Sequence, residues 1–482
     1  MDTKAIDSDR TSIVLWRLRM RYCGVSEYFH DAGISFISDK GDIEFAAHAE
    51  RYSKVKLDPH LVDDLWKMIK PDDITVYYEK ENNRFWPKGS FDFDYTSDHH
   101  ISHAANAYYT RPWKSKEDTV ILTIDGKSHN TCQSVGIYDS DFNLISKKNA
   151  GKSVGIFYSK VTSSIGLKAL HDEYIVMGLA AYGEPLFTEQ FIEAYDSAEE
   201  MDDVDEWNNM FAPPLGKIKK ICHENKREDV AASIQKFAEI KILEYATEAR
   251  KHGSKLVYAG GCALNVVANS LIRPLFDEVW IPTAPGDSGS ALGCAARRYA
   301  LDTGSDHINW KGPYLGYDIK RDINPKEVVD HLLEHTYCGI ANGRAEYGPR
   351  ALGNRSLIAD VRYDVKDTVN EIKRRQKYRP FAPAILEEFA DQYFEGPMNE
   401  YMQYTSKALH DYSSVTHVDG TARVQIVKKD CQSVFRKIIE EYYERTGIPM
   451  LLNTSLNIRG MPMVNDEKDA AVWEKKYGVK VF

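Results

Sequence analysis

Short apolar runs bounded by turn residues begin at Tyr22 and predict a fold that starts with strands. An Asp-Lys-Gly-Asp turn at residues 39–42 joins two of these runs into a hairpin. The predicted strands occupy residues 22–28, 34–38, 43–47, 74–78, 119–124 and 256–259. Residues 1–20 have no clear period, and we treat them as an N-terminal extension.

Apolar residues at helical spacing predict helices between and after these strands. The predicted helices occupy residues 60–69, 99–108, 230–251 and 325–335. Strands and helices together indicate the α/β class, and 482 residues are too many for one hydrophobic core. Gly, Pro and polar residues gather near 303–317 and mark a boundary. The predicted parts are a first domain at 21–305, a linker at 306–316 and a second domain at 317–482.

The net charge of the chain is −10, so no overall basic field favours nucleic acid or an acidic membrane surface. Its seven cysteines include no C-x-x-C pair, which indicates reduced thiols. The N-terminus lacks the apolar segment of a secretion signal, and no apolar run reaches the roughly 18 residues of a membrane span. We therefore expect a cytoplasmic protein without a membrane partner.

Two histidines and two aspartates are candidate metal ligands. His99 and His103 are four residues apart in a predicted helix and so share one face. Asp125 follows the predicted strand at 119–124, and Asp287 lies in a glycine-rich turn before a helix of small residues. The alternative roles of these aspartates are a turn acid and a helix N-cap. A mixed set of imidazole and carboxylate ligands suits iron, manganese or zinc.

A second histidine pair shows that this spacing alone is weak evidence for a metal. His331 and His335 are also four residues apart, within a charged amphipathic helix. We interpret this pair as ordinary residues of that helix.

Glycine-rich segments recur along the first domain, and residues 153–158 and 171–183 are interpreted as turns. The clearest segment follows the strand at 256–259 and leads into a helix. Backbone N–H groups at such a junction can bind phosphates or adenosine. Close packing of the helix on the strand explains the glycines equally well. The candidate nucleotide-binding residues are Gly155, Gly260, Gly261 and Asn265.

The segment 346–360, E-Y-G-P-R-A-L-G-N-R-S-L-I-A-D, carries two arginines among glycines. Guanidinium groups bind phosphate in a bidentate way, and glycine lets the backbone approach a ligand closely. A basic run at 373–379 and a Ser-x-Asn element near the C-terminus add donors, although a charge run is also typical of a solvated face. The candidate residues for a phosphate or another oxyanion are Arg350, Arg355, Lys373, Arg379, Arg423, Ser455 and Asn457.

These segments resemble the ordered motifs of the O-carbamoyltransferases that modify nodulation factors and antibiotics. The motifs include F-H-D-A-G, H-H-I-S-H-A, T-I-D-G, G-G-C-A-L-N, E-Y-G-P-R-A-L-G-N-R-S and N-T-S-L-N-I-R-G. The resemblance implies an actin-like first domain, with a duplicated ribonuclease-H-like ATPase fold, and a YrdC-like second domain. It implies that the two histidines and two aspartates above are metal ligands and that G-G-C-A-L-N lines the nucleotide site. It also implies that His30 is the catalytic residue, whereas the residues alone allow a turn histidine.

The resemblance implies that ATP and carbamoyl phosphate give carbamoyl-adenylate, whose carbamoyl group passes to an acceptor hydroxyl. The implied cofactors are a transition metal, with iron favoured, and Mg²⁺ for ATP. Two positions depart from the family pattern. Tyr174-Ile175 stands where Gly-Lys is usual, and Met461 stands where Glu is usual.

The acceptor stays open between a small hydroxylated metabolite and a hydroxymethyl pyrimidine in DNA, which the net charge does not favour. A homodimer is also left open. The competing interpretations are an actin-like sugar kinase or threonylcarbamoyl-transfer relative, and an inactive regulator that binds a nucleotide or a metal.

Overall fold

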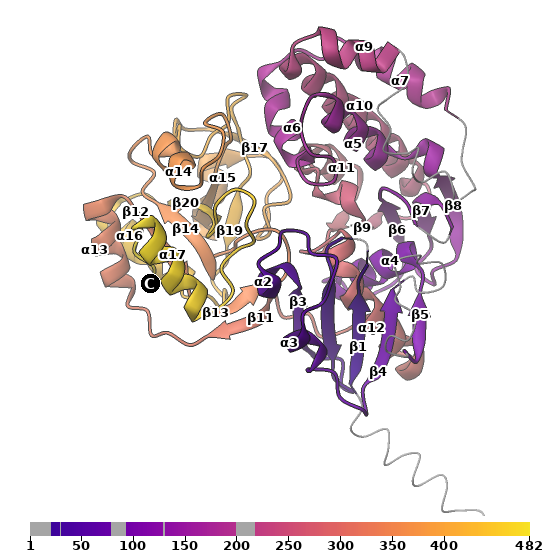
Figure 1. Ribbon diagram of the computed structural model, residues 1–482, viewed down its shortest axis with the longest axis horizontal. Coiled ribbons are helices and arrows are strands. Elements are labelled where there is room, and N and C mark those ends of the chain that lie inside the picture. The colour runs from indigo at the N-terminus through magenta and orange to yellow at the C-terminus, as the bar shows by residue number, and fades with distance from the viewer. Residues whose placement is uncertain (1–20, 29, 79–92, 129–130, 199–216) are drawn as a thin grey trace, which may run out of the picture.

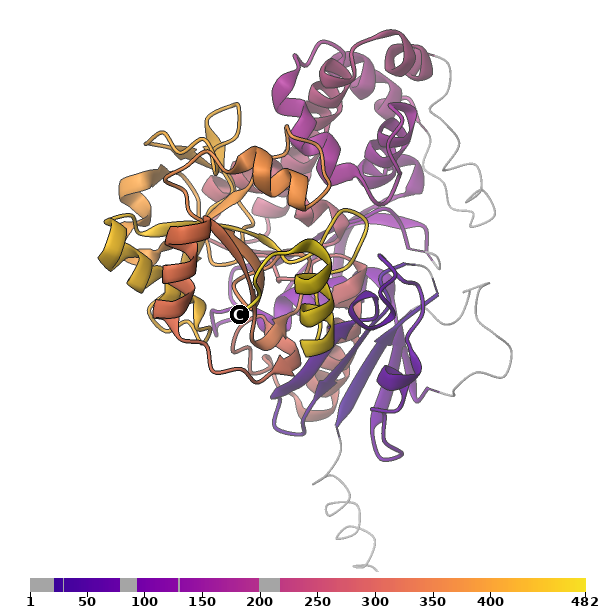
Figure 2. The same ribbon diagram turned by 60° about the vertical axis from the view of Figure 1, so that its left-hand side comes forward.

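The computed structural model describes residues 21–28, 30–78, 93–128, 131–198 and 217–482, so the predicted extension at 1–20 lies outside the described residues. Figures 1 and 2 show the part coloured orange to yellow as a body set beside the part coloured indigo to magenta. The interval between Thr303 and Tyr314 contains no helix or strand, but the first strand of the second body already begins within the predicted linker.

The first sheet of the chain has five strands in the order β3-β2-β1-β4-β5. Its strands are β1 (Tyr22–Ser26), β2 (Gly33–Ile37), β3 (Ile43–His48), β4 (Ile74–Tyr78) and β5 (Tyr95–Ser97). The predicted hairpin is confirmed, since β1, β2 and β3 pair antiparallel. Strand β4 then pairs parallel with β1, and β5 pairs parallel with β4.

The second sheet repeats this order and these directions, as β8-β7-β6-β9-β10. Its strands are β6 (Thr119–Ile124), β7 (Gln133–Tyr138), β8 (Leu144–Asn149), β9 (Lys255–Ala259) and β10 (Glu278–Trp280). Two sheets with one topology are what a duplicated ribonuclease-H-like domain requires. The duplication expected of the first domain is therefore present in the strand order.

Two helices, α4 (His99–Thr110) and α12 (Ser290–Thr303), pack against each other and join the two sheets into one core. The backbones approach so closely that a Cβ on Gly24 of β1 would lie 1.8 Å from the Ala291 carbonyl oxygen. A Cβ on Gly293 of α12 would lie 1.8 Å from the Ser102 carbonyl oxygen. This contact fixes α4 and the turn before α12, which carry candidate metal ligands.

Further helices cover the second sheet on its other side (Figure 1). They are α5 (Val154–Ser164), α6 (Glu173–Leu179), α7 (Thr188–Asp196), α9 (Lys217–Glu224), α10 (Arg227–Arg250) and α11 (Val266–Ile272). The glycine-rich turns predicted at 153–158 and 171–183 are wrong in their main part, because α5 and α6 occupy these segments. The Ser153 hydroxyl caps α5 by accepting from the Ile156 amide.

The helix predicted at 60–69 is also wrong for most of its length. Only four residues are helical, in α3 (Asp63–Trp66), and the short α2 (Glu50–Ser53) precedes it. The Leu61 amide donates to the buried Glu27 carboxylate, which ties this segment to the end of the first strand.

The second body is built on a mixed five-stranded sheet in the order β12-β14-β20-β15-β19, beside a two-stranded and a three-stranded sheet. The strands are β11 (Tyr314–Ile319), β12 (Tyr337–Ala341), β13 (Gly343–Glu346), β14 (Arg355–Ala359), β15 (Ala382–Leu386), β16 (Phe394–Glu395), β17 (Ser406–Ala408), β18 (Thr421–Ala422), β19 (Gln425–Val427) and β20 (Met450–Ser455). The helices are α13 (Pro325–His335), α14 (Lys366–Ile372), α15 (Ala390–Tyr393), α16 (Phe435–Thr446) and α17 (Glu467–Tyr477). Apolar clusters on both faces of the sheet form its core, and its likeness to YrdC stays a prediction.

Buried hydrogen bonds hold the two bodies together. Arg51 donates to the Gly348 carbonyl at 3.2 Å, and the Tyr347 hydroxyl donates to the Ser288 carbonyl at 2.8 Å. The Gln403 amide donates to the Ile281 carbonyl at 2.9 Å. Within the described residues, no helix combines the length and the apolar character needed to cross a membrane.

We expect Gly24→Ala to lower the free energy of unfolding by about 2 kcal/mol or more, because the new methyl group overlaps the α12 backbone. Chemical denaturation followed by circular dichroism measures the change. The matched control is Gly178→Ala in α6, where the nearest atom to a new Cβ lies 3.9 Å away. Equal stability of the two variants would contradict the close contact between β1 and α12.

Candidate active site

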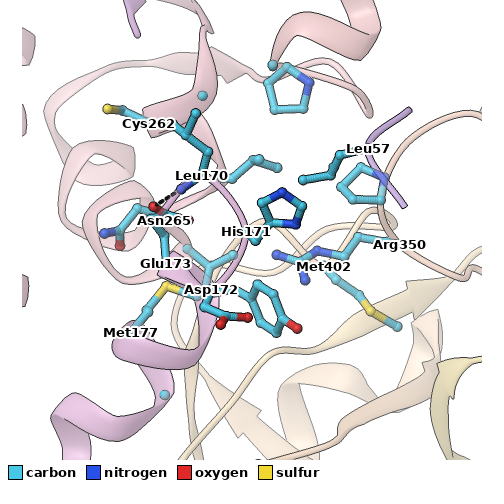
Figure 3. A pocket seen from close by; sticks show the side chains of 18 of the residues that line it. Leu57, Leu170, His171, Asp172, Glu173, Met177, Cys262, Asn265, Arg350 and Met402 are labelled. Carbon is cyan, nitrogen blue, oxygen red and sulfur yellow. Dashed lines mark hydrogen bonds between the residues drawn. The ribbon is translucent and has the colours of Figure 1, made fainter. Parts of the chain in front are cut away.

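One cavity of about 1020 Å³ is lined by residues of both bodies. Figure 3 shows His171, Asp172 and Glu173 from the first body facing the same space as Arg350 and Met402 from the second. Two sets of charged side chains with opposite character lie at this cavity. We call them the ligand group (His99, His103, Asp125, Asp287) and the cation group (Arg350, Lys373, Arg375, Arg379, Arg423). Within the ligand group, His103 is fully buried and the other three residues line the cavity.

The ligand group brings one donor atom from each of its four residues within 4.8 Å of the others. His103 Nε2 lies 3.1 Å from an Asp287 oxygen and 3.2 Å from an Asp125 oxygen. His99 Nε2 lies 3.2 Å from His103 Nε2. The four donors therefore converge on one point, as ligands of a single cation do.

Local structure explains why these four side chains meet. The Asp98 carboxylate caps α4 by accepting from the Ile101 amide, which fixes the helix turn that carries His99 and His103. Asp125 follows β6, and its carboxylate accepts from the Gly126 and Gly261 amides. The Tyr78 hydroxyl bonds His99 Nδ1, which orients that ring from behind.

The electrostatics of the ligand group also favour a cation. Burial disfavours a charged imidazole, yet Asp125 and Asp287 raise the pKa of His103 to about 10. Burial acts to raise the pKa of Asp125, but His103 and His99 together hold it well below its usual range. Two buried carboxylates that stay ionised need nearby positive charge, and a metal ion bound by these four residues would supply it.

His30 lies directly beside this group. Its Nε2 is 3.3 Å from an Asp287 oxygen, and its Nδ1 is 3.0 Å from the Asp31 carboxylate. Burial lowers the pKa of the imidazole, but Asp287 and Asp31 raise it to about 9. The structure thus orients His30 through the Asp31 side chain.

The predicted nucleotide-binding residues divide into two kinds. Gly155, Gly261 and Asn265 line the cavity. Gly260 has φ +95° and is packed so that a Cβ would lie 2.2 Å from the Ile124 carbonyl oxygen. Its glycine is therefore required by the contact between β9 and β6, and it is not a lining residue. Asn265 caps α11 and exchanges hydrogen bonds with Gln235.

The cation group gathers positive charge without acidic partners. Burial lowers the pKa of Arg350 to about 10, and Arg379 contributes in the same direction. Burial and neighbouring arginines likewise lower the pKa of Arg423 and Arg375. Among the described residues, no carboxylate forms an ion pair with these three arginines. Clustered guanidinium groups that repel one another have the chemistry to bind a polyvalent anion.

The Ser-x-Asn element lies next to this cluster. Lys373 Nζ donates to Asn457 Oδ1 at 2.9 Å and to Ser455 Oγ at 3.2 Å. Burial, Arg375 and Arg379 lower the pKa of Lys373. The predicted residues Lys373, Ser455 and Asn457 therefore form one connected part of the cavity wall.

The prediction that Arg355 binds phosphate is wrong. Its guanidinium is fully buried in β14 and is absent from the cavity lining. Its donors are taken by backbone carbonyl oxygens of Tyr317, Asn342, Gly343, Asn354 and Asn465. Arg355 is consequently a structural residue that ties the start of the second body together, with no donor left for a ligand.

Arg375 and Tyr174 are two of the cavity residues that the sequence does not single out. Arg375 lies in the predicted basic run together with Arg374 and Lys377, which are exposed. The segment is a series of turns, so no periodicity distinguishes its inward-facing members. Tyr174 was noted only as a departure from a motif, yet its side chain lines the cavity.

Residues 84–296 match the family described as Carbamoyltransferase N-terminus, and residues 329–482 match the family described as Carbamoyltransferase C-terminus. Nodulation protein NolO of Bradyrhizobium diazoefficiens is 33% identical over 416 residues, which cover 77% of this chain and 75% of that protein. An uncharacterized protein of Methanocaldococcus jannaschii is 29% identical over 497 residues, which cover 92% of this chain and 94% of that protein. The first family match contains the ligand group, and the second contains the cation group.

Among solved structures, the activator of the 2-hydroxyisocaproyl-CoA dehydratase from Clostridium difficile with bound ADPNP aligns at a TM-score of 0.37 and 15% identity. The alignment covers 61% of this chain and 100% of that chain.

We expect His103→Ala to abolish tight metal binding, because this imidazole contacts both carboxylates of the ligand group. Elemental analysis of the dialysed protein should find about one transition-metal ion per chain in the wild type and less than about a fifth of that in the variant. The matched control is the double variant His331→Ala, His335→Ala, which removes the other histidine pair at the same spacing and should keep its metal. Undiminished metal in His103→Ala would contradict the site.

The two arginines of the segment 346–360 should differ in how much they contribute to the free energy of unfolding. Arg355→Met should lower the free energy of unfolding by roughly 3 kcal/mol, because buried backbone carbonyls lose their donor. Arg350→Met, on the cavity wall, should change it by less than about 1 kcal/mol. Urea denaturation compares the two variants, and equal losses would contradict the assignment of Arg355 as structural.

Proposed function

This chain belongs to the carbamoyltransferase family and is a carbamoyltransferase, and from this we propose the reaction that it catalyses. We propose that it uses ATP and carbamoyl phosphate to carbamoylate an acceptor hydroxyl. The observation that carries this proposal is one cavity whose wall includes the cation group and three members of the ligand group, His99, Asp125 and Asp287. A labile intermediate made beside the cations could then reach the ligand group without crossing bulk water.

The first half of the proposed reaction takes place beside the cation group, in a second domain that we propose to be YrdC-like. Water cleaves carbamoyl phosphate to carbamate and phosphate. A carbamate oxygen then attacks the α-phosphorus of ATP, the bond to pyrophosphate breaks, and carbamoyl-adenylate forms. Arg350, Arg379 and Arg423 supply fixed donors for the charge on the phosphoryl groups.

The second half takes place beside the ligand group. The acceptor oxygen attacks the carbamoyl carbon, the bond to the AMP phosphate oxygen breaks, and AMP leaves. His30 takes the proton of the attacking hydroxyl as a neutral imidazole, and Asp31 orients the ring through Nδ1. A cation held by the ligand group would favour this neutral form, because it would lower the pKa of His30 from about 9. Gly261 and Asn265 line the wall on which we place the adenosine part.

His99, His103, Asp125 and Asp287 would hold the metal ion. Their nitrogen and oxygen donors suit iron, manganese or zinc, and we favour iron because the family resemblance implies it. The bound ion would polarise the carbamoyl oxygen as a Lewis acid. Mg²⁺ is proposed to accompany ATP.

The acceptor remains a proposal between a small hydroxylated metabolite and a hydroxymethyl pyrimidine. The net charge of −10 supports the metabolite, because binding of a DNA backbone depends on basic surface. A panel that contains sugars, aminoglycosides and hydroxymethylated oligonucleotides decides between these classes by the mass gain of one carbamoyl group.

We expect the wild type to exchange labelled pyrophosphate into ATP only when carbamoyl phosphate is present. His30→Asn should keep this exchange within about twofold but should lower transfer to the acceptor at least about 100-fold, since it loses the general base. His331→Asn, on the far helix α13, is the control that keeps both activities. Full transfer by His30→Asn, or production of ADP instead of AMP, would contradict the proposed mechanism.

A further inference from the structure

Tyr174, at the start of α6 in the first body, is more exposed than Ile175, and Glu173 beside it is fixed by hydrogen bonds. Glu173 is held by the Ser159 hydroxyl and the Leu170 amide, and Ile175 is fully buried. The Tyr174 side chain is 43% exposed and lines the cavity. Its ring therefore contributes little to the helix core and projects toward the second body.

The ring of Tyr174 meets the cation group across the boundary between the two bodies. The Arg379 guanidinium carbon lies 4.6 Å from the centre of the ring, which is the geometry of a cation–π pair. The phenol is also close enough to oppose the effect of burial on the pKa of Arg350 and Arg375. Tyr174 is thus the contact of α6 with the cation group.

Arg379 needs such a contact because the other arginines of the cation group repel it. Arg350, Arg375 and Arg423 are each affected electrostatically by Arg379, and no carboxylate of the described residues forms an ion pair with it. A long side chain under repulsion would turn out of the cavity unless something held it there. The electron-rich face of an aromatic ring attracts a guanidinium without neutralising its charge.

We propose that Tyr174 is a positioning residue of the cation group, which holds Arg379 toward a bound phosphoryl anion. The full anion affinity of the second body then depends on α6 of the first body. This inference rests on the proposed function only for the identity of the anion, which would be carbamoyl phosphate or the phosphates of ATP.

A general docking role for aromatic residues between the two bodies is the competing explanation, and the chain offers a control for it. Tyr182 also crosses the boundary: its hydroxyl donates to the Tyr378 carbonyl at 3.0 Å, and the two rings lie 5.8 Å apart. Tyr182 is not among the residues that line the cavity. Tyr182→Ala therefore removes a boundary contact and leaves Tyr174 and Arg379 in place.

The test is calorimetric titration of the full chain with inorganic pyrophosphate. Tyr174→Ala should weaken binding about tenfold, or ~1.4 kcal/mol, which lies within the range of a cation–π pair. Tyr174→Phe keeps the ring and should lose less than about threefold. Tyr182→Ala should bind like the wild type. Unchanged binding by Tyr174→Ala, or equal losses in Tyr174→Ala and Tyr182→Ala, would overturn the proposal.

A double-mutant cycle shows whether Tyr174 acts through Arg379. In an Arg379→Ala background, Tyr174→Ala should weaken pyrophosphate binding less than about twofold, because the group that it positions is gone. A full tenfold loss in that background would overturn the inference.

Failure of the proposed function can be distinguished from failure of the proposed role of Tyr174. A wild type that binds pyrophosphate but shows no carbamoyl-phosphate-dependent exchange refutes the adenylate mechanism, while the titrations still decide the role of Tyr174. A wild type that binds neither pyrophosphate nor carbamoyl phosphate refutes the anion site, and with it the role of Tyr174.

Discussion

Charge gathered out of bulk water around one cavity is the constraint on which this structure depends. On one part of the cavity wall, Asp125 and Asp287 lie against the same imidazole and stay ionised. On another part, Arg350, Arg375 and Arg423 repel one another without an acidic partner among the described residues. Taking charges out of water costs several kcal/mol for each ion unless opposite charge is supplied. A cation for the first set and a polyvalent anion for the second satisfy this requirement.

The fold keeps these two sets apart while they share one cavity. The ligand group depends on the close packing of α4 on α12, which glycine makes attainable. The cation group lies on turns of the second body. The buried Arg355 guanidinium stabilises the backbone of this body by donating to its carbonyl oxygens. Hydrogen bonds such as that from Tyr347 to Ser288 hold the bodies against each other. The reacting groups are thus positioned by contacts in which they take no part.

Much of this arrangement could be predicted from local sequence. The strands β4 and β6 and the helix α13 have the predicted bounds, because uninterrupted apolar runs and a Pro at the first helical turn are strong local signals. His99 and His103 share a face in any regular helix, and the acids at strand and helix ends converge with them. The pair His331 and His335 has the same spacing, but nothing in the local sequence says that it lies away from the cavity.

The rest could not be predicted because it depends on contacts between distant segments. Arg350 and Arg355 have the same chemistry and lie five positions apart, yet one lines the cavity and the other is enclosed by backbone carbonyls from Tyr317 to Asn465. Gly260 resembles a phosphate-binding glycine in sequence but is required by the Ile124 carbonyl. Tyr174 and Arg379 form a cation–π contact although they are far apart in the chain and belong to different bodies.

The most direct test of the account is a crystal structure of the chain soaked with a transition metal and pyrophosphate, with the metal located by anomalous scattering. The account predicts an ion bound by His99, His103, Asp125 and Asp287, and pyrophosphate bound by Arg350, Arg379 and Arg423 within the same continuous cavity. An ion or an anion bound elsewhere, or two sites separated by protein, would contradict it.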